Sequence, residues 1–277
     1  MNLEGLSAGI DSSDIHFFQA FSQTRRRLGD AAHRPFSFTD EEQAALRSIY
    51  PGFEPSTWPL MTTARVWLMH GLSWARAPDL LNRLLQHAEI GEQIAIYRGL
   101  FTLQDPTVFS AQVAEGVRTN MVDVFDAIAL NNPVAAWLLD DVGWTQLGLK
   151  AVFMDRPLYR IFGFDSRKTP QLAKAAYEYA HERWSAGRTI HPELWRLLAG
   201  ISDHHMQSAL QRARNDSDEL TARAAGWALG ERDSSAWPLG ELPETEASGW
   251  LAIGLKAEAR SAAAATRDVL YPSPKAS

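Results

Sequence analysis

The sequence contains no cysteine and no long uninterrupted hydrophobic run. Without cysteine among its 277 residues, disulfides, thiolate metal sites and a cysteine nucleophile are excluded. Charged residues or proline interrupt every apolar run before it reaches the roughly 20 residues that span a bilayer. Residues 1–5, MNLEG, lack the basic start and apolar core of a signal peptide. We therefore expect a cytoplasmic protein with no direct membrane insertion.

Positive charge is also scarce. The chain has 33 Asp and Glu against 27 Lys and Arg, for a formal net charge of -6. It lacks the dense positive field that neutralises a phosphate backbone, so nucleic-acid binding is not expected. One basic run, Arg25-Arg26-Arg27, is interpreted as a solvated helix end, where cations meet the negative end of the helix dipole.

Common catalytic and cofactor motifs are missing as well. The sequence has no Gly-x-x-x-x-Gly-Lys phosphate loop, no dinucleotide fingerprint after a strand and no Gly-x-Ser-x-Gly elbow. The pair His181-Glu182 is not part of a zinc protease motif, because the residue four positions after His181 is Ser185. No cofactor is predicted.

Helical periodicity, in contrast, runs through most of the chain. Apolar residues recur at spacings of three and four, and strand-like alternation is hard to find. Strong helix-start signals are a capping box of Thr39 and Glu42 and the pair Thr169-Pro170. The helices expected cover about residues 13–28, 39–50, 59–75, 78–87, 91–103, 106–118, 120–130, 144–154, 157–162, 170–186, 192–199, 203–214 and 217–229, with another opening at 133.

The fold class predicted from this pattern is all-α. Short connections make consecutive helices antiparallel neighbours, which predicts stacked antiparallel helical hairpins. No repeat of fixed period is visible, so a HEAT-like α-solenoid and an irregular helical bundle both remain open. Beyond Glu231 the composition turns to Gly, Pro, Ser and Ala. We expect a helical domain over 1–230 and an appendage over 231–277, with one or two weaker helices in 249–267 and a mobile tail.

Two blocks of residues carry a resemblance to a known family. The first is PGFEPSTW at 51–58, followed by ARVWLM at 64–69. The second comprises EGVRTN at 115–120, VFDAIA at 124–129, NP at 132–133, WTQ at 144–146, LKAVF at 149–153, GFDSR at 163–167, YAHERWSAGR at 179–188 and PELWR at 192–196. In this order the blocks resemble the EboA-domain family over about residues 17–229.

The resemblance implies a role in the traffic of secondary-metabolite precursors toward the periplasm. It also implies partners, namely other Ebo-type proteins including a membrane prenyltransferase-like protein, but it supplies no catalytic mechanism. We therefore expect an accessory protein that binds or hands over a small-molecule metabolite precursor, or that docks partner proteins.

Two helical faces are candidates for such a role. Projection at 100° per residue from Glu115 places Arg118 and Asp126 on one polar side, which either grips a polar ligand or is a solvated face with ion pairs. A second stripe runs along the helix expected over 170–186 and consists of Tyr177, His181, Trp184 and Arg188. It either binds an aromatic or anionic metabolite or packs against another helix. Most of the ten tryptophans are expected in the core, and some are candidates to line a pocket for a flat apolar ligand.

The predicted ligand-binding set combines polar residues from these faces and from the family blocks. It consists of Glu115, Arg118, Asn120, Asp126, Lys150, Asp165, Arg167, His181 and Arg183. A hypothesis of another class is a helical, possibly metal-dependent enzyme that uses His181 with Glu178 or Glu182 as acid and base. Helical di-iron sites need a second Glu-x-x-His pair, which is not found, so no metal ligands are predicted.

Overall fold

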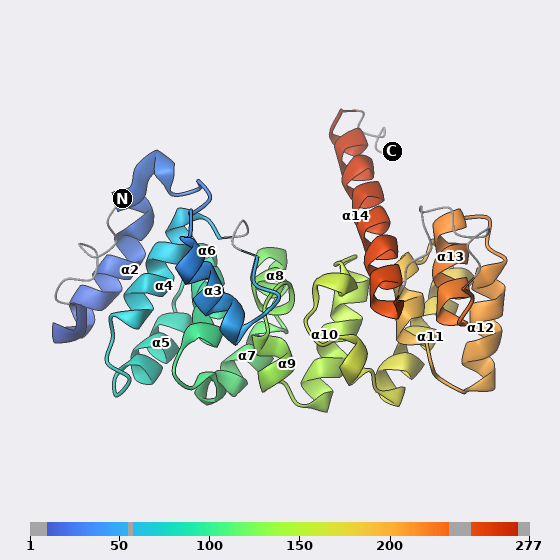
Figure 1. Ribbon diagram of the computed structural model, residues 1–277, viewed down its shortest axis with the longest axis horizontal. Helices are drawn as coiled ribbons and strands as arrows, with labels where there is room; N and C mark the ends of the chain where they lie inside the picture. Colours follow the sequence, from blue (N-terminus) through green and yellow to red (C-terminus); the bar gives the residue numbers. More distant parts are fainter. Residues whose placement is uncertain (1–9, 55–57, 233–244, 271–277) are drawn as a thin grey trace. The chain divides into compact units, whose positions relative to one another are not determined.

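The structure, a computed structural model, describes residues 10–54, 58–232 and 245–270 (Figure 1). Over these ranges the backbone is helical with connecting turns and two isolated β-bridges, and no strand is formed. The expected all-α fold is confirmed. No helix within the described ranges has both the length and the apolar character to cross a membrane. The expected mobile tail at the C-terminus lies outside the described residues.

Two compact units make up the chain. Unit 1 comprises residues 1–146 and 160–163, and unit 2 comprises residues 147–159 and 164–277. Residues on both sides of position 230 therefore belong to unit 2, and the separate appendage after that position stays a prediction.

Unit 1 is built from short helices in which alternate members pack side by side. Helix α4 packs against α2 and α6, and α6 packs against α8, while α5 lies between α4 and α6 along the chain and α7 lies between α6 and α8. This is the packing expected of stacked helical hairpins. The bounds are α2 Asp14–Leu28, α3 Asp40–Ile49, α4 Leu60–His70, α5 Ala77–Leu85, α6 Ile90–Gly99, η4 Leu100–Thr102, η5 Pro106–Phe109, α7 Ser110–Gly116, α8 Val122–Ala129 and α9 Val134–Leu138.

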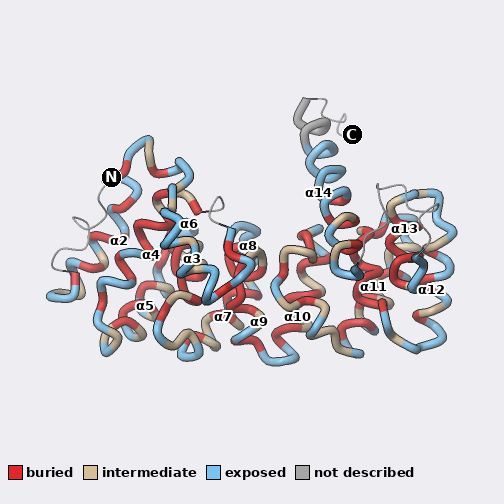
Figure 2. Tube along the Cα trace, in the orientation of Figure 1, coloured by how far each residue is buried: buried red, intermediate tan, exposed pale blue. Residues whose placement is uncertain are grey.

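Burial within unit 1 is unequal (Figure 2). Helix α4 lies between two neighbours and is buried over most of its length, with Trp67 and His70 as its exposed residues. Helix α3 has no buried residue at all. The expected capping box at its start is confirmed, since the Thr39 side chain accepts from the Glu42 N–H and Glu42 accepts from the Thr39 N–H. Local signals therefore fix α3, while core burial contributes little to it.

The prediction of one helical face from Glu115 to Asp126 is wrong, because the two residues do not lie on one helix. Helix α7 ends at Gly116, α8 begins at Val122, and the residues between form a turn. In that turn the Thr119 hydroxyl accepts a hydrogen bond from the Met121 N–H at 3.2 Å. A threonine side chain that bonds the backbone in this way favours a turn over a continuous helix.

Unit 2 is organised around the short helix η8, which packs against α11, α13 and α14. One helix, the 25-residue α14, forms where one or two weaker helices were expected over 249–267. Its buried residues Trp250, Ile253 and Ala257 anchor its first half. Bounds are η6 Leu158–Arg160, η7 Asp165–Arg167, α11 Pro170–Ser185, η8 Pro192–Leu197, α12 His204–Arg214, α13 Glu219–Ala228 and α14 Glu246–Leu270; α10, Asp141–Phe153, runs from unit 1 into unit 2.

Candidate functional site

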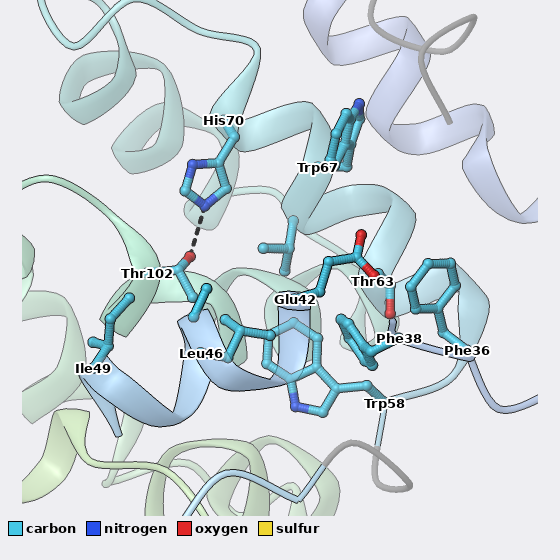
Figure 3. A pocket seen from close by; sticks show the side chains of 12 residues that line it. Phe36, Phe38, Glu42, Leu46, Ile49, Trp58, Thr63, Trp67, His70 and Thr102 are labelled. Carbon is cyan, nitrogen blue, oxygen red and sulfur yellow. Dashed lines mark hydrogen bonds between the residues drawn. The ribbon is translucent and has the colours of Figure 1, made fainter. Parts of the chain in front are cut away.

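An apolar pocket lies between α3 and α4 in unit 1 (Figure 3). Its volume is about 260 Å³, close to the lower end of the range for small-molecule sites. Helix α3, the segment before it, α4 and η4 all contribute to the wall. The lining residues are Phe36, Phe38, Glu42, Ala45, Leu46, Ile49, Trp58, Thr63, Val66, Trp67, His70 and Thr102.

Amphipathic helix α3 forms one side of this pocket. Ala45, Leu46 and Ile49 recur at helical spacing and line the pocket from the same helix. Because α3 buries none of its residues, this apolar side is not covered by a hydrophobic core. An apolar helix face that remains accessible at a pocket is a typical feature of a ligand or partner site.

Packed aromatic rings support the pocket from behind. The Phe38 ring lies 5.5 Å from Phe53 and 6.2 Å from Trp58, both edge-on. Phe101 packs 6.2 Å from Trp58 and 6.3 Å from Phe53. Edge-to-face rings at these distances attract one another and hold a defined shape. The back wall is therefore preformed.

Two large apolar side chains of the pocket are exposed to solvent. Trp67 on α4 retains 41% of its accessible surface and Ile49 on α3 retains 45%. They come from the two helices that face each other across the pocket (Figure 3). A bound apolar molecule would remove this surface from water, at about 25 cal/mol for each Å² of apolar area.

The few polar groups of the pocket already have partners. His70 Nε2 and the Thr102 hydroxyl are 2.8 Å apart, as the dashed line in Figure 3 shows. Although the ring is partly exposed, desolvation by the surrounding protein lowers the pKa of His70, which favours the neutral ring. Glu42 accepts from Thr39 at the start of α3. With its polar groups engaged, the wall suits an uncharged, largely apolar ligand.

Sequence reasoning found this pocket only in part. Trp58 and the pair Val66-Trp67 fall in the first family block, and some tryptophans were candidates to line an apolar pocket, although none of the nine predicted ligand-binding residues lines it. The contribution of α3 was missed, although its capping box and apolar positions 45, 46 and 49 were visible. The sequence pattern does not show that the apolar side of α3 is left uncovered by other helices.

In unit 1 the predicted polar residues lie at the surface. Arg118 Nη1 pairs with Glu115 Oε2 at 2.8 Å, with the side chains 59% and 75% exposed. Asn120 is exposed and Asp126 is half-buried. Burial lowers the pKa of Arg98 and the negative charge of Asp126 opposes this shift, so these two charges lie near each other. The structure thus joins Glu115 with Arg118 and associates Asp126 with a residue outside the predicted set.

In unit 2 the predicted residue Asp165 is held by Arg196. The two side chains form hydrogen bonds of 2.8 and 2.6 Å, and Lys168 Nζ lies 3.8 Å from Asp165 Oδ1. Burial raises and Arg196 lowers the pKa of Asp165, with a lowered pKa as the net result. Lys150 is half-buried, and desolvation lowers the pKa of its amine; Arg167 is half-buried as well.

The predicted aromatic stripe on α11 is continuous through three of its members. The His181 ring lies 4.5 Å from Tyr177 and 5.4 Å from Trp184. Trp184 in turn stacks on the buried Trp195 at 5.5 Å, so this end of the stripe packs against η8. Arg183 donates from Nε to the Thr189 carbonyl at 2.8 Å.

A recess in unit 2 is lined by Arg188, the fourth member of the stripe, and by Trp184. Asp155, His191 and Arg260 also line it, and its volume is about 560 Å³. Arg260 Nη1 pairs with Asp218 Oδ1 at 2.7 Å in the same wall. Mixed charge and little aromatic surface make this recess a weaker fit for a flat apolar ligand than the α3–α4 pocket.

The enzyme hypothesis centred on His181 gains no geometric support. His181 is exposed, and among the described residues no hydrogen bond or ion pair joins it to Glu178 or Glu182. Glu178 Oε1 instead lies 3.9 Å from Lys174 Nζ. In the part of the chain that the structure describes, no three His, Asp or Glu side chains are grouped as metal ligands would be.

The chain was compared with known protein families. The family described as "Metabolite traffic protein EboA" matches residues 6–199, which includes the α3–α4 pocket and all of the sequence blocks quoted above. No curated protein and no solved structure matches the chain.

Proposed function

The chain belongs to the EboA family of metabolite traffic proteins, and on that premise we propose that it binds an uncharged, largely apolar metabolite precursor in the α3–α4 pocket and hands it over to a partner. The apolar side of α3 carries this proposal, because it faces a pocket and buries nothing. Ile49 and Leu46 from α3 and Trp67 from α4 line the same pocket (Figure 3).

Release from this pocket requires little of the core to move. Helix α3 is fixed by its capping box and by the ring of Tyr50, which lies 5.9 Å from Phe101 just after the helix. Elements with few buried contacts are the ones that open at low free energy. We propose that α3 opens to admit and release the precursor while α4 stays in place, in the cytoplasm.

Fluorescence of the uncharged dye N-phenylnaphthylamine tests the pocket directly. We expect saturable binding that Trp67→Ala weakens by about tenfold, since an aromatic anchor in a small-molecule site contributes on the order of 1–3 kcal/mol. Trp137→Ala is the matched control, because Trp137 is 42% exposed against 41% for Trp67 and lies outside the pocket. Equal loss in both variants, or no binding by the wild type, would contradict the proposal.

A second pair of variants examines α3. Ile49→Ala removes a pocket side chain that is 45% exposed, and Ile90→Ala removes one that is 46% exposed elsewhere in unit 1. Dye affinity should fall for the first and stay unchanged for the second. If only Trp67→Ala lowers the dye affinity and Ile49→Ala does not, the dye contacts α4 but not α3, and α3 is not part of the binding site.

Docking of other Ebo-type proteins, including a membrane prenyltransferase-like partner, is the second part of the proposal. The predicted polar residues suit a docking surface, because the Glu115–Arg118 pair is exposed. Exposed pairs contribute about 0–1 kcal/mol to stability, so Arg118→Ala should keep the fold. Co-purification with a neighbour-encoded membrane protein should be lost in Arg118→Ala and retained in Arg47→Ala, a change at an exposed arginine of α3. If both variants still co-purify with the membrane protein, the Glu115–Arg118 surface is not the docking site.

A further inference from the structure

A second recess of unit 1, formed by α2, α4 and the start of α6, has a different chemistry from the apolar pocket. Its volume is about 620 Å³. Three arginines and a histidine face it together with two carboxylates, and its lining shares no residue with the α3–α4 pocket. The lining residues are Ser22, Arg25, Arg26, Gly29, Asp30, His33, Arg65 and Glu89.

Arg65 is a buried cation whose charge is incompletely neutralised. Its side chain is only 4% exposed, and its Nη2 lies 3.8 Å from Glu92 Oε1, a long separation for an ion pair. Nε donates to the Phe21 carbonyl at 3.2 Å, and the guanidinium lies 5.5 Å from the Phe21 ring centre. Buried Nη1 has no hydrogen-bond partner among the described residues. A buried guanidinium that lacks a full set of acceptors is unfavourable unless a further anion compensates it.

Charges of both signs surround this arginine. Burial lowers the pKa of Arg65 most, Glu92 and Glu89 raise it, and the nearby positive charge of Arg25 lowers it again. The Glu92 carboxylate is already engaged, because its Oε2 accepts a hydrogen bond from the Glu89 N–H at 3.0 Å at the start of α6. Arg25 and Arg26 are exposed and free of any ion pair within the described residues. Two guanidiniums near each other at one recess favour an anion beside them.

We propose that this recess binds a phosphate group. Arg25 and Arg26 contact the phosphate oxygens at the rim, His33 adds a ring N–H donor, and Arg65 supplies positive charge from the wall. Guanidinium groups match phosphate because their planar N–H donors bind two oxygens at once. Among the lining residues, the carboxylates of Asp30 and Glu89 leave one of the three arginine charges formally uncompensated, and Glu92 lies 3.8 Å from Arg65.

Calorimetric titration of the full chain with inorganic pyrophosphate tests the site. The double variant Arg25→Gln/Arg26→Gln should bind about tenfold or more weakly than the wild type. Arg27→Gln is the matched control, because Arg27 belongs to the same basic run but contacts Gln23 at 3.4 Å and does not line the recess. Its affinity should stay within about twofold of the wild type, as expected for a rim charge that makes no contact.

A second arm separates a soluble phosphate compound from a lipid headgroup. Phosphatidylcholine vesicles with and without phosphatidic acid are sedimented with the same variants. Binding of pyrophosphate in solution assigns the site to a small molecule, and binding only to vesicles that contain phosphatidic acid, with the same order of variants, assigns it to a lipid phosphate. The inference is overturned if neither probe binds, or if Arg27→Gln loses as much affinity as the double variant.

Two further measurements show whether a loss of pyrophosphate binding arises in this recess, and not from a change in the apolar pocket or from unfolding. Dye binding should be unchanged in Arg25→Gln/Arg26→Gln, since the two linings share no residue. Arg65→Met, with circular dichroism as the check of folding, should abolish pyrophosphate binding. If Arg65→Met fails to fold, the double variant at the exposed Arg25 and Arg26 decides the question alone.

Discussion

Arg196 binds Asp165 through two parallel hydrogen bonds, from Nε to Oδ1 at 2.8 Å and from Nη2 to Oδ2 at 2.6 Å. The same guanidinium places Nη1 3.4 Å from Glu193 Oε1. Its carbon atom Cζ lies 5.9 Å from the Phe164 ring centre and 5.8 Å from that of Trp250. Two family blocks, at 163–167 and 192–196, are therefore tied together in unit 2 by one buried cation. Asp165 is best understood as a structural partner of Arg196.

Arg196→Met should strongly destabilise unit 2. The Arg196 side chain is 7% exposed and Glu193 is fully buried, so the substitution leaves carboxylates without their counter-ion. Loss of one member of a buried ion pair costs about 3–5 kcal/mol. Urea unfolding measures the change, with Arg118→Ala at an exposed pair as the control, for which about 0–1 kcal/mol is expected. A loss below 1 kcal/mol for Arg196→Met would contradict the structural role.

Glu193 should give the fold a distinctive pH dependence. Burial raises its pKa from 4.5 to about 7, although Arg196 and the N–H groups of Leu158 and Tyr159 oppose the change. Between these pH values the folded chain holds a proton that the unfolded chain releases. The free energy of unfolding contributed by Glu193 is therefore complete below about pH 4.5 and is lost as the pH rises through about 7.

Comparison of the wild type with Glu193→Gln isolates this effect. The pKa values of His70 and His191 are lowered by burial, and these two groups make stability rise with pH in an overlapping range. They are common to both proteins and cancel in the difference. The difference in free energy of unfolding should change by up to about 1.4 kcal/mol per pH unit between pH 5 and 7. A difference that is flat with pH would show that Glu193 stays ionised in the folded chain.

Helix α3 should exchange its amide hydrogens faster than α4. It buries no residue, whereas α4 is buried along most of its length. Thr39→Ala removes the capping box, worth about 0.5–2 kcal/mol, and should accelerate exchange in α3 with little change in α4. Hydrogen exchange followed by mass spectrometry measures both, and bound N-phenylnaphthylamine should slow exchange in α3. Equal protection of α3 and α4 would rule out α3 as the mobile side of the pocket.

Gly99→Ala tests the close packing of α6 on α4. A Cβ at position 99 would lie 2.7 Å from Val66 Cγ2 and 3.2 Å from Met69 Cε. Overpacking of a core costs about 1–3 kcal/mol, from which the higher helix propensity of alanine recovers up to about 1 kcal/mol. Thermal unfolding should show a net destabilisation. In the background of Val66→Ala, where both Cγ atoms are gone, Gly99→Ala should be neutral or stabilising; equal effects in both backgrounds would exclude the clash.

Local signals allowed much of the helical structure to be predicted. The capping box at Thr39 and the cap at Thr169 depend on neighbouring residues, and both form as expected. Two glycines with positive φ also follow helices, Gly29 at φ 53° after α2 and Gly187 at φ 63° after α11. Separate helices over 106–118 and 120–130 were expected, but the face projected from Glu115 to Asp126 treated them as one helix. Apolar spacing does not show that the Thr119 hydroxyl accepts from the Met121 N–H in the turn between them.

The candidate sites were harder to predict. The family block at 64–69 contains Trp67 of the apolar pocket and Arg65 of the basic recess, yet the sequence does not tell which of them faces a cavity. The basic run at 25–27 was interpreted as a solvated helix end, and it is one, but only two of its arginines share a recess with the buried Arg65.

The sequence by itself determined the all-α class, the main helix starts and the family of this protein, because hydrophobic periodicity and capping are properties of neighbouring residues. Only the tertiary structure decided that α3 lines a pocket without burying a residue and that Arg196 neutralises Asp165. It also decided that Arg25 and Arg26 share a recess with Arg65. These relationships join residues tens of positions apart, and amphipathic spacing identifies the apolar side of a helix without specifying what covers it.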